Sequence, residues 1–297
     1  MTELTPPVLE GHSGSSGQGY SELKDIECEW RYAHIQSYLK RGVPVPTNGD
    51  EMEAFRAGTY MHAGRAKWMV LGMKVDSDTI KQCQGWAKQD CIAQGYSMPE
   101  LTTLEYELML LNYVNYWAIR AMPKPYAVEL FLEFDFAKYD RDTMKQETGY
   151  IRTTRLDDLS FYPDVGGHCI GEFKTTYDLS GALKFYNANN PQILLQQLIY
   201  QKCNGIDNAI EQVHPTIKGT MVDIWDKARN RGTRQYIPLD AKVLAKFEVF
   251  LISTLRNRKE IITGVRVPQR NYFVCNTFND AYKSQCKFKE RCVESEN

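Results

Sequence analysis

Two strand-like runs separated by a tight turn constrain the fold of this chain more than any other feature. Residues 152–162 (RTTRLDDLSFY) and 168–177 (HCIGEFKTTY) are rich in the β-branched and aromatic residues that favour strands. Between them stands Pro163-Asp164-Val165-Gly166-Gly167, a typical turn composition. The pattern therefore predicts two adjacent strands joined as a hairpin.

The predicted hairpin brings charged side chains together. Glu172 and Lys174 are two residues apart, so they lie on the same face of their strand. The turn places Asp157 beside them, whereas a one-residue shift in register would present Asp158 instead. Asp164 precedes Glu172 closely in sequence but lies in the turn itself, away from the middle of the sheet.

Two carboxylates on neighbouring strands are suited to a hard divalent cation such as Mg²⁺ or Mn²⁺. Such an ion lowers the pKa of its bound water and stabilises charge on a scissile phosphate, and an adjacent lysine can orient that water. Taken alone, Glu172 and Lys174 are equally well explained as an ion pair on a solvated strand face. Glu129, on the preceding strand-like run, is either a further contributor or a charge at the rim.

The order of the predicted elements indicates the fold class. Helical patterns dominate residues 20–122, strand patterns follow, and helical patterns return at 190–205 and 239–262, with a further strand-like run at 213–227. This order predicts an α/β fold with a mixed sheet core flanked by helices, a helical N-terminal half and a cysteine-rich C-terminal tail. We expect a disordered tail over 1–20 and a single domain over 21–297, divided into a helical part (21–125), a core (126–205) and a C-terminal part (206–297).

The bulk composition limits where the protein works and what it binds. The net charge of −1 excludes a general basic surface, so contact with nucleic acid must depend on local patches. Basic and aromatic residues mix at Arg152 and Arg155, at 229–236 and at 287–291, although each cluster is as well explained as a solvated face. No apolar run is long enough to span a bilayer and no export signal is present, so a cytoplasmic location is expected, with eight reduced cysteines.

Two further polar patterns flank the hairpin. Gly58-Thr59-Tyr60-Met61-His62 places a histidine on a predicted helix upstream, and Gln196 and Tyr200 share one face of a predicted helix downstream. Each pattern alone is weak, since a lone helical histidine is usually structural.

In combination, the ordered motifs resemble the RecB-type branch of the PD-(D/E)xK nuclease superfamily, over residues 58–200. The resemblance implies a restriction-endonuclease-like core in which His62, Asp157 and Glu172 ligate Mg²⁺ or Mn²⁺ and Lys174 is catalytic. It further implies that Gln196 and Tyr200 support the site and contact DNA. Thr154 stands where the family commonly has a glycine before the aspartate.

The same resemblance extends to cysteines. Cys28 lies near the start, and the final 23 residues hold Cys275, Cys286 and Cys292. The iron–sulfur branch, which includes CRISPR adaptation nucleases and is similar to phage exonucleases, uses one N-terminal and three C-terminal cysteines. The resemblance to this branch implies a [4Fe–4S] cluster here, with zinc as the alternative. Cys275 and Cys286 are further apart in sequence than the corresponding cysteines of the family.

The sequence therefore predicts a metal-dependent DNA nuclease, with an exonuclease favoured over an endonuclease. Its expected partner is DNA with a free end or single-stranded region, and a recombination or replication protein is a further expected partner. The alternative is a catalytically silent nuclease fold that binds DNA or a protein partner.

Overall fold

The computed structural model describes residues 49–136, 138–140, 145–147, 150–204 and 214–265. The described residues form two compact units. One comprises the described residues of Ala54–Phe134 and Thr153–Leu244, and the other comprises residues 49–53, the described residues of Asp135–Arg152, and residues 245–265. The candidate site lies entirely within the first unit.

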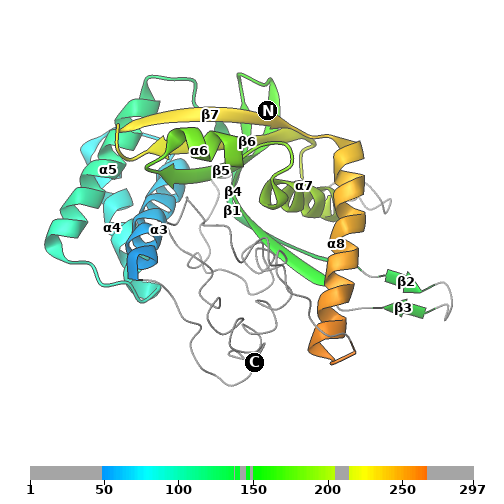
Figure 1. Ribbon diagram of the computed structural model, residues 1–297. Coiled ribbons are helices and arrows are strands. Elements are labelled where there is room, and N and C mark those ends of the chain that lie inside the picture. Colours follow the sequence, from blue (N-terminus) through cyan, green and yellow to red (C-terminus); the bar gives the residue numbers. More distant parts are fainter. Residues whose placement is uncertain (1–48, 137, 141–144, 148–149, 205–213, 266–297) are drawn as a thin grey trace. The chain divides into compact units, whose positions relative to one another are not determined.

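Thirteen elements span the described residues (Figure 1). The helices are α3 (Gly49–Val70), α4 (Ser77–Ala93), α5 (Glu100–Ala118), α6 (Leu179–Phe185), α7 (Pro191–Cys203) and α8 (Ala241–Ile262). The strands are β1 (Lys124–Asp135), β2 (Lys138–Asp140), β3 (Lys145–Glu147), β4 (Ile151–Tyr162), β5 (Gly167–Thr176), β6 (Ile217–Asp226) and β7 (Arg231–Pro238).

Five strands form one mixed sheet in the order β1-β4-β5-β6-β7. The β4–β5 and β6–β7 pairs are antiparallel, whereas β5 and β6 run parallel because α6 and α7 form the crossover between them. The predicted α/β fold with a mixed sheet flanked by helices is therefore confirmed.

The predicted hairpin forms at the predicted turn. Tyr162 pairs with Gly167, and the Gly166 amide donates to the Tyr162 carbonyl at 2.9 Å. Gly166 has a φ of +64°, a left-handed conformation that glycine adopts without steric cost. The register ends at Asp158 opposite Gly171, so β4 and β5 separate beyond that pair.

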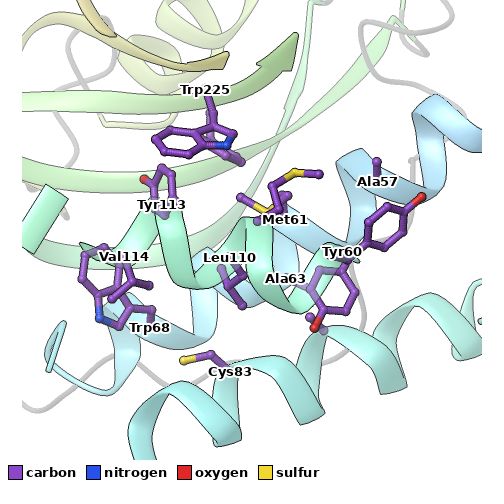
Figure 2. Packing of buried hydrophobic residues seen from close by; sticks show 14 of the residues in the cluster. Ala57, Tyr60, Met61, Ala63, Trp68, Cys83, Leu110, Tyr113, Val114 and Trp225 are labelled. Carbon is purple, nitrogen blue, oxygen red and sulfur yellow. The ribbon is translucent and has the colours of Figure 1, made fainter. Parts of the chain in front are cut away.

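Helices cover both faces of the sheet. On one face, α3, α4 and α5 enclose an aromatic core in which Tyr60, Trp68 and Tyr113 pack with Phe173 of β5 and Trp225 of β6 (Figure 2). On the other face, Ile193 of α7 packs with Val222 and Ile224 of β6. Because strand side chains alternate, Phe173 belongs to the first face and Glu172 to the second.

Local sequence explains the start of α7. Asn190 caps the helix, since its side-chain oxygen accepts hydrogen bonds from the amides of Gln192 and Ile193. Pro191 occupies the first turn, where its missing amide costs nothing. This cap fixes the helix that presents Gln192 and Gln196 to the sheet.

The second unit contains the small β2–β3 pair and most of α8. Lys138 pairs with Glu147 in antiparallel register. The Tyr150 amide donates to Asp135 at 3.0 Å, and Lys259 of α8 lies 5.3 Å from the centre of the Tyr150 ring. The predicted single domain over 21–297 stays a prediction.

In the basic segment at 229–236, three arginines contact other side chains of the protein, and two of them, Arg229 and Arg231, are 64% and 50% exposed. Residues 231–238 form β7, and Arg229 and Arg231 both lie within 4 Å of the buried Asp226 carboxylate, at 3.4 and 3.6 Å. Arg234 stacks on Trp117 at 3.8 Å. The cluster at 287–291 lies outside the described residues, as does the expected tail over 1–20. None of the described helices combines the length and apolarity that crossing a membrane requires.

Candidate active site

Asp157 lies where β4 and β5 separate. Its Oδ2 accepts a hydrogen bond of 2.6 Å from the Phe173 amide, so the side chain takes the place of a backbone partner just past the last paired residues. Continuing the hairpin register by one residue sets Asp157 opposite Glu172, on the same face. The Asp157 side chain remains 15% exposed.

His62 reaches Asp157 from helix α3. Its Nδ1 lies 3.4 Å from Asp157 Oδ1, and its ring packs edge-on against Phe173, with 5.0 Å between ring centres. Burial alone would raise the pKa of Asp157. His62 when protonated, followed by Lys174 and Arg65, outweighs burial and holds that pKa well below its usual range, so Asp157 is a carboxylate at neutral pH.

Glu172 is buried, with side-chain exposure of 2%, and both of its oxygens have partners. The Gln196 amide donates to Oε2 at 2.5 Å, and the Gln192 amide donates to Oε1. Lys174 Nζ lies 2.5 Å from Oε1. These contacts fix the orientation of the carboxylate.

The charges of Glu172 and Lys174 depend on each other. Burial raises the pKa of Glu172, while Lys174 opposes that shift. Burial would lower the pKa of Lys174, but the Glu172 carboxylate outweighs it and the pKa is raised. Lys174 is therefore a fixed positive charge beside two carboxylates.

Glu129 of β1 belongs to the same electrostatic cluster. Burial, followed by the negative charge of Asp157, raises the pKa of Glu129 to about 8. Its φ of +54° is left-handed, which is strained for a residue with a side chain. Strained backbone is common at functional sites, so the conformation is consistent with a role for Glu129 beyond that of a rim charge.

Asp158, the alternative to Asp157, points into a separate buried network on the opposite face. Its Oδ2 lies 2.6 Å from Arg65 of α3, and its Oδ1 accepts hydrogen bonds from Ser160 and Tyr162. The network continues through Tyr113, which accepts from Arg65 at 3.1 Å and donates to Asp223 at 2.9 Å. These contacts give Asp158 a structural role.

The structure brings together most, but not all, of the predicted site residues. His62, Asp157, Glu172, Lys174 and Gln196 converge, whereas the buried Tyr200 donates its hydroxyl to the Pro215 carbonyl at 2.6 Å. Sequence reasoning missed Gln192, although it lies four residues before Gln196 and so shares its helix face. The four proposed cluster cysteines (Cys28, Cys275, Cys286 and Cys292) lie outside the described residues.

The donor chemistry of the cluster suits a divalent cation: an imidazole nitrogen and two carboxylates. Gln196 Oε1 is buried and lacks a hydrogen-bond partner, which leaves an acceptor available beside Glu172. Among the described residues, no three histidine, cysteine, aspartate or glutamate side chains are arranged as a group that could hold a metal ion.

No protein-family model matches the sequence, and the search of curated proteins finds no match. Among solved structures, the chain is similar to a protein from Eubacterium rectale named "Putative exonuclease". The two share 10% sequence identity with a TM-score of 0.48, over 95% of this chain and 94% of that one.

Proposed function

We propose that this protein is a Mg²⁺- or Mn²⁺-dependent deoxyribonuclease that acts as an exonuclease. The observation that carries the proposal is the convergence of His62, Asp157, Glu172 and Lys174 from three elements. The order of the sequence motifs supports the same proposal. The resemblance to RecB-type nucleases implies site roles for these same four residues.

His62, Asp157 and Glu172 are the residues that would hold the cation. When bound, it would supply positive charge to the scissile phosphate and acidify the attacking water. The low pKa of Asp157 supports this assignment, because a metal-binding carboxyl group must be ionised. An imidazole ligand favours Mn²⁺ over the harder Mg²⁺.

Lys174 would act on the reacting phosphate. The Glu172 carboxylate raises the pKa of Lys174, so the side chain is an ammonium that can donate hydrogen bonds. Its role is to orient water and to offset the negative charge that develops on the phosphate oxygens. Gln192 and Gln196 hold the Glu172 carboxylate in place, which makes them positioning residues.

The [4Fe–4S] cluster stays a separate proposal. It rests on the sequence pattern of Cys28, Cys275, Cys286 and Cys292, with zinc as the alternative metal. Iron and zinc analysis of protein purified without oxygen distinguishes the two. DNA with a free end is the proposed substrate, and a recombination or replication protein is the proposed partner.

Incubation of the protein with end-labelled linear DNA and with closed circular DNA tests the activity. We expect release of short labelled products from linear DNA with Mn²⁺ or Mg²⁺, none with EDTA, and intact circles. Calorimetric titration with Mn²⁺ is the second measurement, in which Glu172→Ala should bind the ion more weakly than the unaltered protein. Absence of metal-dependent cleavage of either substrate contradicts the proposal, and cleavage of circles contradicts the exonuclease assignment.

A further inference from the structure

Helix α5 has apolar side chains on two sides, and only one of them is needed for the core. Its inner side includes Tyr106, Leu110, Tyr113 and Val114, which are buried in the aromatic core that α5 shares with α3 and α4 (Figure 2). Its outer side carries leucines that are exposed. Leu101 is 83% exposed, Leu104 53% and Leu108 52%.

The exposed leucines follow a heptad pattern. Leu101, Leu104, Leu108 and the half-buried Leu111 are spaced three, four and three residues apart, which is the spacing of the a and d positions of a coiled coil. On a helix of 3.6 residues per turn this spacing forms one narrow stripe. Asn115 and Ala118 continue the pattern, and Ile119, also 83% exposed, lies beside its end.

Such a stripe is more than the scattered exposure of single apolar residues that is normal on protein surfaces. An a/d seam is suited to packing against another helix with the same spacing. Asn115 interrupts the apolar series at one a position, which costs some stability. A second copy of the chain supplies a seam of the same kind.

The charges beside the seam select an orientation. Glu100, Glu105 and Glu107 lie in the first half of α5, whereas the second half has Asn112 and is followed by the exposed Arg120. In a parallel pair, Glu100 at a g position would face Glu105 at the e position of the partner, and like charges would repel. An antiparallel pair sets the acidic half against the neutral and basic half.

We propose that the α5 seam (Leu101, Leu104, Leu108, Leu111, Asn115 and Ala118) joins two copies of this protein as an antiparallel homodimer. In an antiparallel pair, each a position of one helix faces a d position of the other. Leu108 of each copy therefore packs on Leu111 of its partner, which gives two equivalent contacts related by the twofold axis. Leu104 of each copy faces Asn115 of the other, and Leu101 faces Ala118. The contact is self-complementary, as a twofold interface requires. This inference does not rest on the proposed activity.

Sedimentation velocity of the full chain over about 1–100 μM tests the proposal. We expect a dimer whose dissociation constant rises at least tenfold in Leu108→Glu. The matched control is Ile92→Glu on α4, since Ile92 is a similarly exposed apolar residue outside the seam, at 55%, and should leave association unchanged. Because both positions are exposed, the circular dichroism spectra and melting temperatures of the variants should remain close to those of the unaltered protein.

A charge pair tests the orientation. Leu104→Lys should weaken the dimer, and addition of Asn115→Glu should restore it, because the two positions face each other only in the antiparallel arrangement. In a parallel pair each new charge would face its own copy, so the double variant would associate more weakly than either single variant. A monomer throughout the concentration range, or a dimer unaffected by Leu108→Glu, overturns the proposal.

Discussion

Replacing Asp158 by asparagine should destabilise the fold far more than the same change at its neighbour Asp157. Asp158 is fully buried and lies 2.6 Å from Arg65, whose side chain is only 4% exposed. Removing the carboxylate leaves a buried guanidinium with Asp223 at 4.0 Å as its nearest charge. Loss of one partner from a buried ion pair typically lowers the free energy of unfolding by about 3–5 kcal/mol. Because Asp223 remains beside Arg65, we expect a value of ~3 kcal/mol here.

The same change at Asp157 has a different energetic balance. Its side chain is 15% exposed and loses an ionic contact with His62 at 3.4 Å, while the amide oxygen can still accept from the Phe173 amide. Removing its charge loses attraction to Lys174 and Arg65 but also relieves repulsion with Glu129 and Glu172. We expect a loss of about 1 kcal/mol or less, as for partly exposed ion pairs.

Urea unfolding at pH 7 in EDTA, followed by circular dichroism, measures both free energies. A cost of ~3 kcal/mol corresponds to a fall in melting temperature of roughly 6–12 °C for a domain of this size. Removing both partners, as Arg65→Met with Asp158→Leu, should cost less than the sum of the single changes, because no buried charge is left unpaired. Equal destabilisation by Asp157→Asn and Asp158→Asn would refute the assignment of the two aspartates to different faces and roles.

Three further predictions follow from individual contacts. Glu129 has a folded-state pKa of about 8 against about 4.3 when unfolded, so the free energy of unfolding should fall as pH rises from about 5 to 8. Glu129→Gln should flatten that fall in thermal melts across this range, and parallel profiles for the two proteins would argue against the raised pKa. Gly171→Ala should lower the free energy of unfolding in urea by more than about 2 kcal/mol, because the new methyl group would overlap the Asp158 carboxylate. The control is Gly85→Ala on α4, where the methyl group meets open space and should leave stability unchanged or higher. Gln192→Ala should slow metal-dependent cleavage about tenfold without loss of fold, and an unchanged rate would remove Gln192 from the site.

Much of the site could be predicted because its geometry is local. The turn at 163–167 fixes the hairpin register, and alternation along β5 then places Glu172 and Lys174 together. Helix periodicity likewise located α7 and α8 to within a few residues, and α3, α4 and α5 all lie within the predicted helical stretch over 20–122. These features depend on neighbours in sequence.

The remainder depends on contacts between distant residues. Arg234 resembles part of a basic surface in sequence, but pairing of β7 with β6 leaves it 12% exposed, at 4.0 Å from the buried Asp223 carboxylate. Tyr200 lies on the same helix as Gln196, but the Tyr200 hydroxyl donates its hydrogen bond to the carbonyl of Pro215, whose position could not be predicted from the helix. The seven-residue α6 was missed because it is too short for a clear period.

The measurement that tests the central claim most directly is the cleavage rate of end-labelled linear DNA by Lys174→Ala in Mn²⁺, relative to the unaltered protein. Lys174 contacts Glu172 and lies in the field of Asp157, so its loss should reduce the rate at least 100-fold, about the contribution of one electrostatic donor to a transition state. Circular dichroism and DNA affinity should remain near their original values. A folded Lys174→Ala protein that cleaves DNA at the original rate would contradict the account.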